Sequence, residues 1–349
     1  MALYFAAWQQ AGAGAEYGEL ALQWISDALD RQNFDEPQFL AQQVWVMWAA
    51  RQLDRQYEQS GNSRFCDDID EMLLEHLLQT PLWTESFDLI HGLAAVGGYA
   101  LALGHEGCGE AMFERVLQLL DGIACKQDGF QWWACTPENT TSSILQRAPH
   151  GYSDLGLAHG NAGIMVLLAR AIQQGMHQAL AGPMLEKLAA WMLAQQNAPG
   201  CASRFAYIAE EPGVVSRAAW CYGDVGIGWA LVCAGQVMAR EDWIESGVRA
   251  AHAVMLRVPG TLGFDDDALC HGRAGVGHIL LRQARMVNDA SLASFAHNLL
   301  EQALQALEAG NGIEGADASY LEGLAGVGLA LMDAVFEPDM PWDYPLLLG

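Results

Sequence analysis

The sequence predicts an all-α fold, an α/α toroid in which an inner and an outer layer of helices form about six to seven hairpins. One observation is a sequence motif of glycines and small residues, called a glycine phrase below, that recurs five times. Successive copies are separated by 49 to 68 residues, by subtraction. Each phrase also opens an apolar helix, and no strand-rich segment of comparable length is present. Repeated hairpins of this kind are typical of a helical toroid. The first glycines of the five phrases are Gly92, Gly160, Gly223, Gly272 and Gly323.

Three helices are predicted before the first phrase, over residues 15–32, 37–60 and 67–80. Their apolar residues recur at helical spacing. Pro37 suits the first turn of the second helix. The third helix begins with acidic residues at its positive end and stops before Pro81. The segment that leads into the repeats is therefore helical.

From the first phrase onward, the helices are predicted in pairs. The first helix of each pair is apolar nearly all round, as an inner helix would be, and the second carries charge on one face, as an outer helix would. A last inner helix is predicted over 325–336. The predicted pairs are 92–104 with 109–126, 161–176 with 182–197, 225–240 with 243–257, and 274–287 with 290–308.

Two connections are long, residues 127–158 and 198–219, and both lead to the end of the toroid where the phrases open. We expect short strands in them, as a small β-containing insertion, and expect them to grip a substrate. Trp132-Trp133 is interpreted either as an aromatic wall for a peptide or as a packed loop. Because the phrases span most of the chain, residues 1–349 are expected to form a single domain.

The composition excludes several classes of protein. With 42 acidic and 17 basic residues and a net charge of −25, the chain lacks the basic surface that nucleic acids require. Its eight cysteines show no disulfide spacing, which suits a reducing compartment. The chain start has no basic stretch of a secretion signal, and no apolar run is long enough to cross a bilayer. We therefore expect a cytoplasmic protein without a transmembrane segment.

Cysteines stand beside the first glycine in two neighbouring phrases. Cys221 precedes one inner helix, and Cys270-His271 precedes the next. The positive N-terminal ends of helices favour thiolates, and two thiolates with an imidazole are good zinc ligands that leave a fourth position open. Read singly, these residues would be buried cysteines and a core histidine at tight turns. Their equivalent places in adjacent repeats favour one catalytic Zn²⁺ site.

At these residues the sequence resembles a known family. Trp220-Cys221-Tyr222-Gly223, followed by the stretch from Cys270 to Gly275, is similar to the motifs of the lanthionine synthetase C-like family, and the likeness runs from about Asp88 to Ala330. The resemblance implies an α/α toroid with one zinc held by Cys221, Cys270 and His271. It also implies a lanthipeptide cyclase, which adds peptide cysteine thiols to dehydroalanine or dehydrobutyrine and so forms lanthionine or methyllanthionine thioether rings.

Four further positions match the family's motifs, namely Asp88, His159, Arg217 and Tyr222. Attack of a thiolate on the β-carbon creates an enolate that needs a proton at the α-carbon. The resemblance assigns that proton to His159, with Arg217 stabilising the enolate, Asp88 tuning the histidine and Tyr222 lining the pocket. Read alone, His159 would be a turn histidine, Asp88 and Arg217 capping or surface residues, and Tyr222 a packing residue.

The implied substrate is a dehydrated precursor peptide, so the expected partners are a separate lanthipeptide dehydratase and an exporter. Two alternative functions stay open. One is addition of glutathione to dehydrated residues by the same zinc site. The other is a zinc-containing scaffold that binds a peptide or a dehydratase without doing chemistry.

Overall fold

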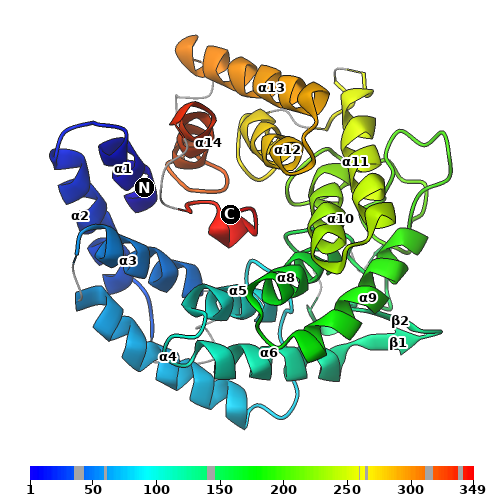
Figure 1. Ribbon diagram of the computed structural model, residues 1–349, viewed down its shortest axis with the longest axis horizontal. Helices are drawn as coiled ribbons and strands as arrows, with labels where there is room; N and C mark the ends of the chain where they lie inside the picture. Colours follow the sequence, from blue (N-terminus) through cyan, green and yellow to red (C-terminus); the bar gives the residue numbers. More distant parts are fainter. Residues whose placement is uncertain are drawn as a thin grey trace.

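The computed structural model describes residues 1–34, 43–58, 61–139, 146–258, 260–263, 266–310, 317–336 and 341–349. Within these ranges, thirteen α-helices form the two concentric layers of a closed ring (Figure 1). Each inner helix contacts the next one along the chain, and the last contacts the first, so the ring is complete. The predicted α/α toroid is thereby confirmed. The inner helices are α1 (Ala2–Gln10), α3 (Val44–Gln56), α5 (Leu93–Leu103), α8 (Asn161–Gln174), α10 (Asp224–Met238), α12 (Arg273–Val287) and α14 (Leu324–Phe336).

Each outer helix packs on the inner helix that precedes it, which gives six hairpins and leaves α14 as a last inner helix. Inner helices such as α5 and α10 are apolar on nearly all sides because both of their faces are covered; every residue of α10 from Asp224 to Val232 is buried. The outer helices expose a charged face. They are α2 (Glu16–Asp30), α4 (Gly61–Gln79), α6 (Gly109–Ile123), α9 (Gln178–Ala194), α11 (Glu241–Met255) and α13 (Ala290–Glu308).

The predicted helix over 109–126 is wrong at its C-terminal end. Helix α6 stops at Ile123, and β1 (Cys125–Gln127) pairs antiparallel with β2 (Phe130–Trp132). The two residues between the strands, Asp128 and Gly129, both have positive φ, as a tight hairpin turn requires. The expected β-containing insertion is thus this hairpin.

Other boundaries also differ from the sequence-based expectation. The sequence pattern does not predict α1, because its short and mostly apolar sequence gives no amphipathic signal; α2 and α14 pack against it in the structure. The helix predicted over 67–80 begins earlier, at Gly61, and the one predicted over 182–197 spans Gln178–Ala194. In place of 37–60, α3 covers Val44–Gln56, and residues 35–42 and 59–60 lie outside the described part.

The long connections are only partly as expected. The connection 127–158 contains β2, but 198–219 holds no strand, only a single bridge between Asp154 and Ile208. Trp133 is fully buried, and its Nε1 donates to the carbonyl of Leu120 at 2.9 Å. The packed-loop interpretation of this tryptophan pair therefore holds better than an aromatic wall.

The C-terminal segment fills the centre of the ring (Figure 1). The indole Nε1 of Trp220 donates to the carbonyl of Leu346 at 3.0 Å, and that of Trp229 donates to the carbonyl of Leu347 at 2.8 Å. Both leucines are buried. The segment is therefore part of the core, and it ties the turn before α10 to the axis of the toroid. No helix in the described ranges has both the length and the apolar character needed to cross a bilayer.

A buried ionic contact anchors this segment. Asp343 is fully buried, with His278 Nε2 and Arg282 Nη2 each 2.8 Å from its Oδ2. We expect Asp343→Ala to lower the free energy of unfolding by about 3–5 kcal/mol, because it removes the buried carboxylate that pairs with both His278 and Arg282. Burial raises the pKa of Asp343, but His278 and Arg282 lower it overall. Its stabilisation is therefore present above the unfolded-state pKa and is lost as pH falls through the folded-state value.

Urea unfolding at neutral and acidic pH measures both effects. The difference between wild type and Asp343→Ala should shrink on acidification. Asp242→Ala is the matched control, since it breaks the exposed Arg240–Asp242 pair and should change the unfolding free energy little. Equal losses in the two variants would contradict a structural role of the buried contact.

Candidate metal centre and acid–base site

The glycine phrases share one backbone turn at the N-terminal ends of the inner helices. In four of the five phrases, the amide of the residue after the first glycine donates to the carbonyl of the residue six positions before that glycine. This bond folds the preceding loop over the start of the helix, so that the two residues before the glycine are held at the mouth of the ring. The bonded pairs are Leu93 with Ser86, Asn161 with Asp154, Arg273 with Asp266, and Leu324 with Asp317.

In four of the five phrases, close approach of the backbone requires the second glycine, three residues after the first; the first phrase has Ala95 at this position. A Cβ at Gly275 would overlap the carbonyl oxygen of Leu269, and a Cβ at Gly326 would overlap that of Tyr320. The loop therefore lies directly on the first turn of the helix, where no side chain fits. Cys270 and His271 lie inside this tight turn, which restricts their positions.

The structure brings Cys221, Cys270 and His271 together. One ligand atom from each lies within 4.8 Å of the other two. Cys221 comes from the turn before α10, and the other two come from the turn before α12; the amide of Cys221 donates to the carbonyl of Cys270 at 3.3 Å. The two neighbouring turns thus place three donor groups at one point, as the repeat spacing predicts.

The charges around the cluster suit a metal cation. The hydrogen bond from Cys270 lowers the pKa of the Cys221 thiol, against the effect of burial, and Arg217 adds to the lowering. The same bond, together with burial, raises the pKa of Cys270. One proton is therefore shared where two thiolates would repel each other. A divalent cation removes that repulsion, and two sulfurs with one imidazole nitrogen form a donor set typical of zinc.

His271 is oriented by a carboxylate. Its Nε2 lies 3.0 Å from Asp266 Oδ2, so Nδ1, which has the exposed Glu322 carboxylate at 3.8 Å, is the nitrogen we assign to a metal. Burial acts to lower the pKa of His271, but Cys270 and Asp266 raise it overall. Asp266 stands six residues before Gly272, so the same loop that forms the turn supplies this partner.

A histidine–aspartate pair lies beside the cluster. His159 Nδ1 is 2.7 Å from Asp88 Oδ2, while the other carboxylate oxygen of Asp88 accepts the backbone amides of Ile90 and His91 at 3.1 and 2.7 Å. Burial lowers the pKa of His159, but Asp88 raises it overall, with smaller contributions that include the Cys270 sulfur. The half-buried imidazole is thus held in one orientation, with its pKa raised, within the electrostatic reach of the cluster.

Tyr222 and Arg217 complete the predicted set. The ring centroid of Tyr222 lies 6.1 Å from that of His159, and its hydroxyl donates to Asp154 at 3.1 Å. The backbone amide of Arg217 donates to the Tyr207 hydroxyl at 2.9 Å. The half-buried Arg217 lies near enough to Cys221 to lower the pKa of its thiol.

Besides Asp266, two residues at this end of the ring were missed by sequence reasoning. Asp154 is 1% exposed, and burial raises its pKa to about 6. It accepts the Tyr222 hydroxyl and the amide of Gly156, so it fixes both the turn and the tyrosine. The sequence contained a signal for Asp154, because Asp266 and Asp317 likewise stand six residues before the first glycine of their phrases. The second missed residue, His91, stacks on His159 with ring centroids 6.5 Å apart.

These features define a class: an α/α toroid with a sulfur-rich candidate metal centre and a histidine–aspartate pair at one end. The chain matches the model of the lanthionine synthetase C-like protein family over residues 1–345. It belongs to this family. The match covers the turns that carry the cluster and those that carry the pair.

Two known proteins show the likeness in detail. The chain is 24% identical over 275 residues to the nisin biosynthesis protein NisC of Lactococcus lactis subsp. lactis, an alignment that covers 75% of this chain and 64% of that protein. It thus spans less than two thirds of that relative. The solved structure of a nisin cyclase superposes with a TM-score of 0.74 at 21% identity, covering 87% of this chain and 78% of the other. At this identity, the structural likeness shows the fold.

Proposed function

We propose that the protein is a zinc-dependent lanthipeptide cyclase, which adds cysteine thiols of a dehydrated peptide to dehydroalanine or dehydrobutyrine residues of the same peptide. The observation that carries the proposal is the Cys221–Cys270–His271 cluster beside the His159–Asp88 pair, at the mouth of one toroid. Membership of the lanthionine synthetase C-like family and the likeness to a protein named nisin cyclase support it.

The cluster would hold one Zn²⁺ through its two sulfurs and the free nitrogen of His271. When bound, zinc lowers the pKa of a coordinated thiol, so that a substrate cysteine is available as a thiolate at neutral pH. Three protein ligands leave room for that thiol. Asp266 keeps the imidazole turned so that Nδ1 is offered to the metal.

The remaining residues handle the charge and the proton of the reaction. The sulfur forms a bond to the β-carbon, the electrons of the double bond move toward the carbonyl oxygen, and an enolate results. His159, whose pKa is raised by Asp88, donates a proton to the α-carbon. The charge of Arg217 stabilises the enolate. Tyr222, fixed by Asp154, forms the pocket wall next to His159.

The chemistry also implies what must come before. An alkene in the peptide has to be produced by dehydration of serine or threonine, so a separate dehydratase prepares the substrate. An exporter that removes the product would be a further partner. Because free thiols and dehydrated residues must coexist until the ring closes, a reducing cytoplasm suits the reaction.

A cyclisation assay tests the proposal. The zinc-loaded protein is incubated with a synthetic peptide that contains one cysteine and one dehydroalanine, with and without glutathione. Ring closure leaves the peptide mass unchanged but removes the thiol that iodoacetamide would alkylate, and we expect this result at a rate well above that of the peptide alone. An adduct with the added mass of glutathione would favour the alternative thiol transfer. Binding without any reaction would favour a scaffold.

A further inference from the structure

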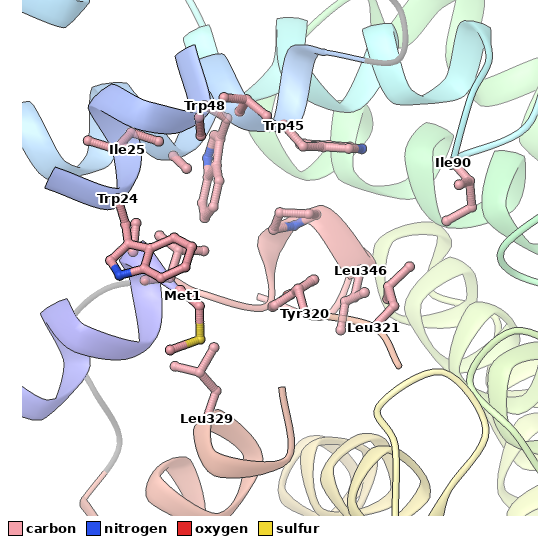
Figure 2. A pocket seen from close by; sticks show the side chains of 16 residues that line it. Met1, Trp24, Ile25, Trp45, Trp48, Ile90, Tyr320, Leu321, Leu329 and Leu346 are labelled. Atoms are coloured by element: carbon pink, nitrogen blue, oxygen red, sulfur yellow. The ribbon is translucent and has the colours of Figure 1, made fainter. Parts of the chain in front are cut away.

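An apolar pocket, drawn in Figure 2, is lined in part by residues from the glycine-phrase turns. Its volume is about 320 Å³, within the range of small-ligand pockets. The walls come from the start of α1, from α2, from the start of α3 and from the C-terminal segment. The turns before α5 and α14 supply Ile90 and Leu321. In Figure 2, Trp24 stands at one side of the pocket and Ile90 at the other.

The pocket is lined by two of the glycine-phrase turns that neighbour the turns of the candidate centre. Ile90 and Leu321 stand two residues before the first glycine of their phrases, the place that Cys221 and Cys270 occupy in theirs. The amide of Cys270 donates to the carbonyl of Leu321 at 3.0 Å. On the other side, Ile90 is followed by His91, which stacks on His159. The pocket therefore adjoins both the metal-ligand turn and the acid–base turn.

The lining accepts an apolar group and offers little to a polar one. Among the described residues no charged side chain lines it, and the α-amino group of the lining residue Met1 has its pKa lowered by burial. The indole Nε1 of Trp45 is directed to the carbonyl of Leu89 at 3.4 Å, and the Tyr320 hydroxyl donates to the carbonyl of Trp342 at 2.7 Å. Trp24 is 42% exposed and brings the apolar lining to the surface. Accessible apolar surface beside a reaction centre is a mark of a binding site.

We propose that this pocket binds an apolar side chain of the substrate peptide, close in sequence to the cysteine or dehydro residue that reacts. This inference rests on the proposed function, because it names how that substrate is held. An anchored Leu, Ile, Phe or Trp sets the register of the peptide across the mouth of the ring. That register decides which thiol meets which alkene.

Two variants on α2 change the pocket without touching the candidate centre. Trp24→Ala removes one wall, and Ala28→Phe places a ring inside the pocket. Both positions are at least partly exposed, so the fold should tolerate the changes. Trp8→Ala is the matched control, since Trp8 has a similar exposure of 38% on α1 but does not line the pocket.

The first measurement compares two dehydrated peptides that differ only in Leu or Asn next to the reacting cysteine. For the wild type and for Trp8→Ala, we expect a KM about tenfold lower for the Leu peptide, at similar kcat, as the burial of one aliphatic side chain implies. Trp24→Ala and Ala28→Phe should lose this preference. A wild type that does not distinguish the peptides, or pocket variants that still do, would overturn the proposal.

A second measurement separates the pocket from the reaction. The probe is an unreactive peptide with alanine in place of dehydroalanine and a photoreactive leucine analogue in place of Leu. We expect cross-links to α2 and α3 in the wild type and not in Ala28→Phe. Cross-links without ring closure of the dehydrated peptide would refute the proposed function but support the pocket. Ring closure without cross-links would refute the pocket alone. Decanoate serves as an apolar competitor for the pocket: if it abolishes the cross-links but leaves the KM for the peptide unchanged, the pocket is likewise refuted.

Discussion

Replacing Cys270 with alanine is expected to abolish zinc binding and to slow ring closure by on the order of 10³-fold. Cys270 is the central donor of the cluster, because its sulfur is hydrogen-bonded to Cys221 and its chain neighbour is His271. Without it, only one thiol and one imidazole are left, too few to hold a divalent ion tightly. Metal analysis of the purified protein should show about one zinc per chain in the wild type and close to none in the variant.

The control is Cys125→Ala, which removes a half-buried cysteine of β1 that belongs to no cluster among the described residues. It should keep both its zinc and its activity. Treating the wild type with a chelator should reproduce the Cys270→Ala defect, and adding zinc back should restore only the wild type. A Cys270→Ala protein with a full complement of metal, or with undiminished ring closure, would show that the ligand set is wrong.

The second large effect is expected for His159→Ala, a loss of about 10²–10⁴-fold in kcat with the metal content unchanged. The structure places this imidazole beside the cluster and not among its donors, held by Asp88 at 2.7 Å. Removing it should therefore leave substrate binding intact and slow the proton transfer to the enolate. A thiol adduct that loses stereochemical control, or an enolate that reverts to starting peptide, would also be consistent with a missing acid.

The pH profile tests the same assignment through Asp88. Burial acts to lower the pKa of His159, but Asp88 raises it overall. An acid must be protonated to act, so kcat/KM should fall as pH rises through this raised pKa. Asp88→Asn removes the charge that raises it, and the falling limb should move to lower pH. Two results would contradict the role of His159 as the acid. One is a falling limb of the pH profile at the same pH in Asp88→Asn as in the wild type. The other is loss of zinc from His159→Ala.

The candidate metal centre was predictable because it is built from equivalent positions. Cys221 and Cys270 both stand two residues before the first glycine of their phrases, and neighbouring repeats of a toroid place equivalent residues side by side. The turn that holds them is also local, since Gly275 accommodates the Leu269 carbonyl only a few residues away. Equivalent positions in adjacent repeats thus lie side by side, even though the backbone at Gly223 (φ 77°) differs from that at Gly272 (φ −100°).

Asp154 shows where the same reasoning stops. Its place before Gly160 matches those of Asp266 and Asp317, so the repeat contains the signal, but a comparison of the phrases that starts near their glycines does not reach it. The hairpin after α6 is similar. Asp128-Gly129 is a strong turn signal, yet the helical spacing of the residues before it extends the predicted helix into the first strand.

The sequence alone determined the all-α class, the two layers, the five turns and the meeting of the three candidate ligands, because each depends on residues within one hairpin or on the repetition of that hairpin. Only the tertiary structure decided that α1 closes the ring against α14, that the C-terminal segment fills its centre and that an apolar pocket opens beside the candidate centre. The Trp220–Leu346 bond joins residues 126 positions apart. Such contacts form only when the whole ring has closed, and no local pattern of side chains specifies them in advance.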